Sequence, residues 1–201
     1  MIDKGTSARF HKDRRIQIGY YDASVADLNG LKYGLATCPI CQSEKSLFTF
    51  NPKNDPENEW ICLECLEKGN FDFQHNTECG FVDRDIPEAL ADCDAKENVS
   101  QDAYFEMGKT PNYLSLQGEE WLCHCNDFMV YKGTWEAPDF TEESPINNGK
   151  ALFMEMTDAI QNHLWDEFDL KDDEMESSWN DCLYHAFECK HCKVKRGYWE
   201  Y

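Results

Sequence analysis

The sequence TCPICQSEKSLFTFNPKNDPENEWICLECLEK, residues 37–68, contains two Cys-x-x-Cys pairs separated by twenty residues. The pairs are Cys38 with Cys41 and Cys62 with Cys65. A Cys-x-x-Cys turn lets two thiolates converge on one ion, and a second pair completes a tetrahedron with Zn–S distances of about 2.3 Å. Disulfides or unlinked buried thiols are the alternative, but the matched spacing favours zinc. Because four thiolates leave zinc no position for water, such a site is expected to stabilise the fold and not to catalyse.

Two short β-prone runs, SLFTF and EWI, lie between the pairs and are separated by NPKNDPEN, which is typical of a turn. We therefore expect a hairpin whose open end is held by the metal, forming a zinc-ribbon-like unit over residues 38–82. The predicted fold class is α+β, with antiparallel β-hairpins stapled by zinc, a few packed helices and one main domain. Residues 1–37 are interpreted as an N-terminal arm or edge segment. Residues 83–201 are expected to hold helices and a C-terminal zinc-knuckle hairpin.

The C-terminal sequence CLYHAFECKHCKVKRGYWEY, residues 182–201, contains a third Cys-x-x-Cys pair. Alternation in Leu183–Glu188 and in Val194–Tyr201 predicts two strands, with Cys189 and Cys192 in the turn between them. This turn is half of a zinc site and needs two more ligands.

The remaining ligands of this second site are expected from residues 123–125, where the sequence reads Cys-His-Cys. On a strand, Cys123 and Cys125 would share one face and His124 would point away. His124 is nevertheless a candidate substitute, and the choice among the three stays open. A second cluster of buried thiols is the alternative to a second zinc ion.

Five further segments carry secondary-structure predictions. Residues 85–99 and 101–107 are expected to form short helices, with Cys93 on the packed face, and residues 110–135 one or two strands. His75 and Cys79 fall in a predicted loop, where Cys79 is interpreted as a buried small hydrophobe. Residues 147–170 are expected to form one amphipathic helix, with His163 beside its packed face. The predicted core-facing stripe of this helix consists of Leu152, Phe153, Met156, Ile160, Leu164 and Phe168.

The cysteine usage predicts a reducing compartment. Eleven cysteines are present, an odd number, whereas secreted disulfide frameworks usually have an even number and a signal peptide. The first residues show neither an apolar segment nor a cleavage motif, and no stretch approaches eighteen apolar residues. We therefore expect a cytoplasmic protein with no membrane association.

The formal net charge is −20, and acidic residues concentrate in two regions. Residues 51–107 carry fifteen acidic and four basic residues, and residues 136–176 carry thirteen and two. Such a surface repels phosphate backbones, so nucleic-acid binding is not expected. It attracts a basic protein partner, although an acidic face kept for solubility is the alternative. The predicted contact face consists of Glu142, Glu143, Asp172, Asp173, Glu174 and Glu176.

Several catalytic signatures are missing from the sequence. It contains no HExxH, GxSxG or GxGxxG motif and no glycine-rich phosphate loop. None of the six histidines is followed two residues later by Glu, as the zinc deaminases require. No catalytic residue is therefore predicted.

Four blocks, in order, resemble the CbrC family of bacterial proteins, which is named for colicin tolerance. They are CPIC at Cys38–Cys41, WICLECLEKGNFDF at Trp60–Phe73, TPNYLSLQGEEWLCHCNDFMVYKG at Thr110–Gly133 and AFECKHCKVKRGYWEY at Ala186–Tyr201. The resemblance implies a zinc-dependent scaffold and protection against a bacterial toxin, and it favours His124 and Cys125 over Cys123 as ligands. The family usually has a glycine after the first and the last Cys-x-x-Cys turn. This chain has Gln42 and Lys193 at those positions.

Two functions are compatible with these observations. The first is a zinc-stabilised acidic immunity or tolerance protein that neutralises a basic toxin, for example a nuclease bacteriocin or a contact-delivered toxin domain. The second is a zinc-dependent enzyme or a redox or metal sensor that uses residues 123–125 with Cys189 and Cys192. A site with three protein ligands and a water would permit zinc chemistry, whereas four protein ligands on each zinc would favour the binding function.

Overall fold

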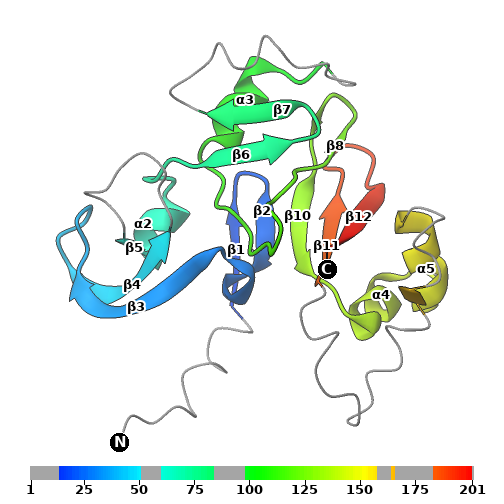
Figure 1. The fold of residues 1–201 in the computed structure, drawn as a ribbon, viewed down its shortest axis with the longest axis horizontal. Helices are drawn as coiled ribbons and strands as arrows, with labels where there is room; N and C mark the ends of the chain where they lie inside the picture. The colour runs from blue at the N-terminus through cyan, green and yellow to red at the C-terminus, as the bar shows by residue number, and fades with distance from the viewer. Residues whose placement is uncertain (1–13, 51–59, 84–97, 158–163, 166–182, 201) are drawn as a thin grey trace, which may run out of the picture.

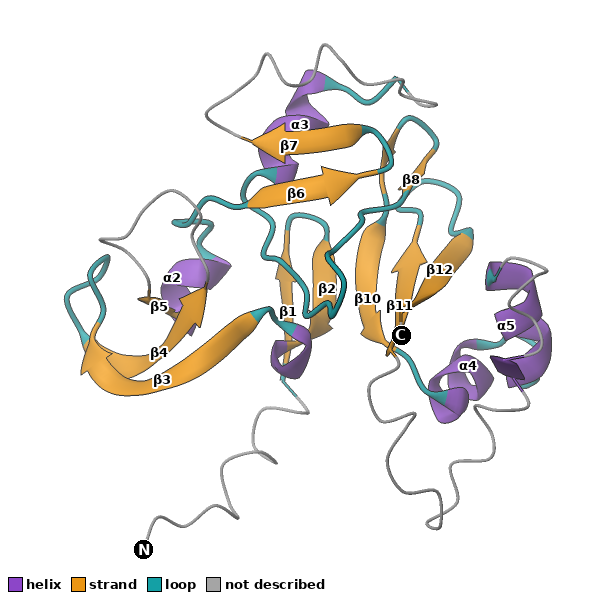
Figure 2. Ribbon diagram, viewed as in Figure 1, coloured by secondary structure: helices purple, strands orange, loops and turns teal. Residues whose placement is uncertain are grey.

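The computed structural model describes residues 14–50, 60–83, 98–157, 164–165 and 183–200. A mixed five-stranded sheet in the order β1-β2-β10-β11-β12 forms its centre. A three-stranded sheet, β3-β4-β5, lies on one side of it with helix α2, and helices α4 and α5 lie on the other side (Figures 1 and 2). The fold is therefore α+β, as predicted, with several antiparallel hairpins and, in the described part of the chain, the four α-helices α2 to α5.

The strands of the central sheet come from three separate regions of the chain. They are β1 (Arg15–Ile18), β2 (Tyr21–Ser24), β10 (Val130–Thr134), β11 (Leu183–Glu188) and β12 (Lys195–Glu200). All neighbouring pairs are antiparallel except β2 and β10, which meet in parallel at Tyr21 and Tyr131. Residues 1–37 are expected from the sequence to be an arm or an edge segment, and within the described residues β1 is an edge strand of this sheet, whereas β2 lies inside it between β1 and β10. Tyr21 and Ala23 are fully buried, so this β-hairpin belongs to the core of the domain.

The first double Cys-x-x-Cys region forms the three-stranded sheet. It consists of β3 (Gly30–Thr37), β4 (Glu44–Phe50) and β5 (Trp60–Cys62), followed by α2 (Leu63–Glu67). The strand β4 pairs antiparallel with β5, with Leu47 opposite Cys62. The predicted hairpin is thus confirmed, and its open end lies beside the cysteines.

Two small hairpins lie above the central sheet in Figure 2. One joins β6 (Gln74–Thr77) to β7 (Gly80–Asp83), and the other joins β8 (Cys123–His124) to β9 (Asp127–Phe128). The loop predicted around residue 75 is therefore a hairpin, with His75 in β6 and Cys79 in the turn. Cys79 is buried, as predicted.

The remaining elements are η1 (Val25–Asp27), α3 (Gln101–Met107), α4 (Ala137–Glu143) and α5 (Gly149–Met156). Side chains of Ser100 and Asn148 cap α3 and α5 by accepting hydrogen bonds from their first turns. The helix predicted over residues 101–107 is confirmed, whereas the one predicted over residues 85–99, with Cys93, lies outside the described residues.

The predicted continuous helix over residues 147–170 is interrupted at Thr157, although Leu164 and Trp165 are again helical. Helix α5 ends at Met156, because Thr157 is extended and its hydroxyl lies 2.9 Å from that of Tyr184. Leu152, Phe153, Met156 and Leu164 are nevertheless buried as expected. Ile160, His163 and Phe168 lie outside the described residues.

Strand β11 connects two hydrophobic clusters because its side chains alternate between the two faces of the sheet. Tyr184 and Ala186 pack against α4 and α5, in a cluster that also contains Phe140 and Phe153. Phe187 belongs to the larger cluster, which extends to the three-stranded sheet. Both faces of β11 are buried, so this strand is the centre of the core.

Candidate metal centres

The first group of metal ligands lies at the open end of the β4–β5 hairpin. Cys38 and Cys41 come from the turn between β3 and β4, whereas Cys62 ends β5 and Cys65 lies in α2. The Sγ atoms of Cys38 and Cys65 are 3.9 Å apart, and those of Cys41 and Cys62 are 3.8 Å apart. A tetrahedron with Zn–S bonds of about 2.3 Å has edges of about 3.8 Å. The four predicted ligands therefore lie where one tetrahedral ion can hold them.

The packing of these thiols affects their acidity. Burial raises the pKa of the Cys62 thiol to about 12, and the neighbouring thiols of Cys65 and Cys38 also raise it. The exposed Cys41 differs, because hydrogen bonds from the backbone and hydroxyl of Ser43 lower its pKa to about 6. A divalent cation binds thiolates and releases their protons, so it would stabilise this cluster in its charged form. The donor set thus fits a soft divalent metal.

The second group joins the C-terminal hairpin to the β8–β9 hairpin. It consists of His124, Cys125, Cys189 and Cys192, whose ligand atoms all lie within 4.8 Å of one another. The Sγ atoms of Cys125 and Cys192 are 3.7 Å apart, and His124 Nδ1 lies 3.2 Å and 3.3 Å from them respectively. Three thiols and one imidazole form a common tetrahedral donor set for zinc.

The structure places Cys123 outside this second group. Its side chain is buried and contacts Cys79 instead. The expectation that Cys123 and Cys125 share a face is wrong, because Cys125 and Asn126 form a turn in which both have positive φ, 55° and 58°. This turn directs His124 and Cys125 to the same point.

The two knuckles that carry Cys-x-x-Cys have the same backbone. In the first, the N–H of Gln42 donates to the carbonyl of Cys38 (2.9 Å); in the second, the N–H of Lys193 donates to that of Cys189 (3.0 Å). Gln42 and Lys193 both have positive φ, 57° and 62°, a conformation that favours glycine. Glycine would therefore be the least strained residue at both positions.

Asp127 fixes the second knuckle to β9. Its carboxylate accepts hydrogen bonds from Tyr20 (2.6 Å) and His191 (2.8 Å) and pairs with Lys190 (2.7 Å). Burial opposes the ionisation of Asp127, but these partners hold its pKa below the usual value. The knuckle is therefore held in place by an ionised carboxylate beside the four candidate metal ligands.

Replacement of Cys192 tests the second group with little disturbance of the core, because this residue is exposed. We expect Cys192→Ala to remove one of two bound metal ions and to lower Tm by a few degrees without unfolding the protein. The β8–β9 and β11–β12 hairpins should still stay together without this ion, because β10, which follows β9, pairs with β11 along the whole of β10. Metal analysis and thermal melting measure both effects, with Lys193→Asn as a matched control, because Asn tolerates positive φ. Unchanged metal content in Cys192→Ala would contradict the assignment.

Of the predicted contact residues, the structure describes only Glu142 and Glu143, both exposed near the end of α4. Glu143 pairs with Lys195 at 2.7 Å. Asp172, Asp173, Glu174 and Glu176 lie outside the described residues. Within the described part of the chain, no helix is long and apolar enough to cross a membrane.

The fold and its two ligand groups define an α+β protein with two sites that can each hold a metal ion. Residues 20–200 match the model of an uncharacterised protein family, UPF0167, and the chain belongs to this family. No curated protein and no solved structure matches the chain.

Proposed function

We propose that this chain is a zinc-stabilised acidic protein that binds and neutralises a basic protein toxin in the cytoplasm. The observation that supports a binding function is the ligand count. Each group offers four protein atoms, which fill the coordination shell of a tetrahedral zinc ion. Zinc bound in this way has no position for a catalytic water, so the zinc-dependent enzyme is the weaker of the two hypotheses.

The partner class follows from charge. With a net charge of −20, the chain accelerates encounter with a cationic protein and repels nucleic acids. The proposal that this cationic partner is a toxin rests on the resemblance to the CbrC family. The contact face that we propose contains Glu142 and Glu143, together with the acidic residues at 172–174 and 176.

Co-expression tests the proposed neutralisation. Products of genes adjacent to the one that encodes this chain are expressed singly, and those that stop growth are expressed again together with the chain. We expect growth to be restored for one basic product, which should then bind the purified chain directly. Growth arrest that persists with every toxic neighbour would contradict the proposal.

Charge reversal tests the contact face. With the toxin identified, Glu142→Lys combined with Glu143→Lys should slow association about threefold to tenfold at low salt, because steering depends on these charges. Reversal of Asp172, Asp173 and Glu174 should act in the same direction. Stopped-flow association kinetics measure the rate, with Glu44→Lys as a matched control, because Glu44 is exposed on the three-stranded sheet. Kinetics that do not change across a salt titration would exclude electrostatic steering.

A further inference from the structure

Cys79 and Cys123 are in contact, although neither belongs to a metal group. Their Sγ atoms are 3.1 Å apart, and the residues are 1% and 3% exposed. In the metal groups the measured Sγ–Sγ distances are 3.7–3.9 Å, as a shared tetrahedral ion requires. A separation of 3.1 Å is too short for an edge of such a tetrahedron. Among the residues that the structure describes, neither thiol joins a group of three or more ligands.

Cys79 lies on a fixed backbone in the two-residue turn between β6 and β7. The hydroxyl of Thr77 accepts a hydrogen bond from the N–H of Cys79 (3.0 Å) and donates one to the carbonyl of Gly80 (2.7 Å). The turn cannot rotate Cys79 away from Cys123 without breaking both bonds.

Cys123 is fixed to the same turn through Glu78. The N–H of Cys123 donates to Glu78 Oε2 (2.7 Å), and the carbonyl of Cys123 accepts from Arg196 (2.9 Å). Arg196 also pairs with Glu78 at 2.8 Å. A carboxylate and a guanidinium thus connect the backbone of Cys123 to Glu78, the residue that precedes Cys79.

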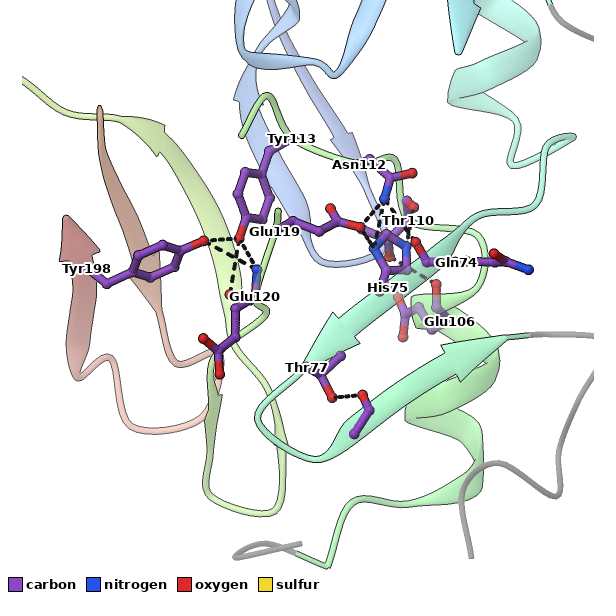
Figure 3. A network of polar contacts seen from close by, with 11 residues as sticks. Gln74, His75, Thr77, Glu106, Thr110, Asn112, Tyr113, Glu119, Glu120 and Tyr198 are labelled. Atoms are coloured by element: carbon purple, nitrogen blue, oxygen red, sulfur yellow. Dashed lines mark hydrogen bonds and ion pairs between the residues drawn. The ribbon is translucent and has the colours of Figure 1, made fainter. Parts of the chain in front are cut away.

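A buried polar network holds the rest of the β6–β7 hairpin (Figure 3). His75 Nε2 donates to the carbonyl of Thr110 (2.9 Å), and His75 Nδ1 lies 3.1 Å from Glu119. The amide of Asn112 donates to the carbonyl of Gln74 (3.0 Å). Because these contacts fix β6 against residues 110–119, the two thiols are held together at high effective concentration.

We propose that Cys79 and Cys123 are a redox site that forms a reversible disulfide with a small two-electron oxidant such as hydrogen peroxide. One thiol attacks a peroxide oxygen, which forms a sulfenic acid and releases one water. The second sulfur then displaces the sulfenic oxygen, which leaves with the second thiol's proton as another water. Two thiols are oxidised, and one peroxide is reduced to two waters. The sulfurs need to approach by about 1 Å to reach the bonding distance of about 2.05 Å.

Burial determines which oxidant this pair accepts. Buried thiols react slowly, and bulky disulfides cannot reach sulfurs that are 1% and 3% exposed, so only a small oxidant reaches the pair. Once one sulfenic acid forms, the neighbouring thiol captures it before further oxidation. The pair therefore forms a disulfide and does not accumulate irreversible sulfinic acid.

The bond would link the β6–β7 hairpin covalently to β8. Cys123 directly precedes His124, so the link lies beside the second metal group. It would close a loop between positions 44 residues apart, and we expect it to raise Tm by about 5–10 °C. This inference does not depend on the identity of the toxin.

The test uses the full-length, metal-loaded protein treated with hydrogen peroxide in stoichiometric steps. We expect the intact mass to fall by two hydrogens before a chromogenic chelator detects released metal. Trypsin separates residues 69–84, which contain Cys79, from residues 110–132, which contain Cys123 and Cys125. Under non-reducing conditions these two peptides should be joined, and fragmentation should assign the bond to Cys123. Dithiothreitol should restore the original mass and Tm.

Three outcomes would overturn the proposal. They are a bond from Cys79 to Cys125, sulfinic acid at Cys79 without a cross-link, and oxidation only after metal release. Cys79→Ser should lose the two-hydrogen mass change while keeping its metal content. The peptide map of the unmodified chain decides the question even if this variant folds poorly.

Discussion

Cys62→Ser is expected to leave the chain without a stable fold. Cys62 is fully buried, ends β5 and is the N-cap residue of α2, so its thiolate would hold a strand and a helix to the same ion. Structural zinc contributes an apparent ~10–16 kcal/mol in small modules, comparable with the whole stability of a domain at about 5–15 kcal/mol. Serine fills nearly the same volume but is a poor zinc ligand. The loss of binding energy therefore exceeds what the rest of the fold supplies.

Chelation of the purified protein should have the same effect. We expect a strong chelator to abolish the cooperative melting transition, as followed by circular dichroism together with metal analysis. The matched control is Cys79→Ser under reducing conditions, because Cys79 is also buried but lies outside both metal groups. This control should bind the full complement of metal and melt cooperatively. A Cys62→Ser protein with an unchanged Tm would disprove the stabilising role of the first group.

The first group could be predicted from the sequence because its geometry is local. A Cys-x-x-Cys turn fixes two sulfurs within four residues, and the hairpin between residues 44 and 62 joins the two turns. The C-terminal knuckle was predictable for the same reason. Leu183–Glu188 and Lys195–Glu200 form the two expected strands on either side of Cys189 and Cys192.

The ligands of the second group could not be predicted from the alternation of side chains along a strand, because the chain turns at Cys125 and Asn126. His124 and Cys125 reach the same point only because Cys125 and Asn126 both have positive φ. Asn126 was the available signal, since Asn adopts this conformation more readily than most residues. The choice between Cys123 and His124 depended on that single turn.

Long-range contacts could not be predicted from local patterns. The contact between Cys79 and Cys123 joins two hairpins, and the pairing of β2 with β10 joins residues 110 positions apart at Tyr21 and Tyr131. Helix α5 ends at Met156 because the hydroxyl of the next residue, Thr157, bonds to that of Tyr184 in β11. In each case a tertiary interaction overrides the local periodicity.

Glu200→Gln is expected to lower the free energy of unfolding by about 3 kcal/mol, which corresponds to a fall in Tm of about 6–12 °C. Glu200 is 2% exposed and accepts hydrogen bonds from Ser115 Oγ (2.6 Å), His185 Nε2 (2.8 Å) and the N–H of Gln117. It therefore ties the last strand to the segment before β8. Glutamine has nearly the same size but lacks the charge that strengthens all three bonds.

The pH dependence identifies the charge state of this buried pair. Burial holds the pKa of His185 below its usual value although the Glu200 carboxylate opposes this effect, so the imidazole is neutral. Burial raises the pKa of Glu200, but hydrogen bonds from Ser115 and His185 outweigh it and hold the pKa below the usual value. A carboxyl with a lowered pKa contributes stability above its unfolded pKa of about 4.5 and loses it as pH falls further. His185 also destabilises the fold below about pH 6.5. In that range its imidazole binds a proton more readily in the unfolded chain than in the folded chain.

The difference in stability between the unmodified chain and Glu200→Gln should therefore not shrink between pH 8 and pH 6. Both proteins keep His185 neutral in the fold, so its contribution largely cancels in the difference. If His185 were instead charged and paired with Glu200, its folded pKa would be raised. Its contribution would then disappear as pH rises through that value, and the difference would shrink above pH 7. Urea unfolding at several pH values measures this difference. Glu143→Gln is the matched control, since its exposed pair with Lys195 should contribute less than about 1 kcal/mol.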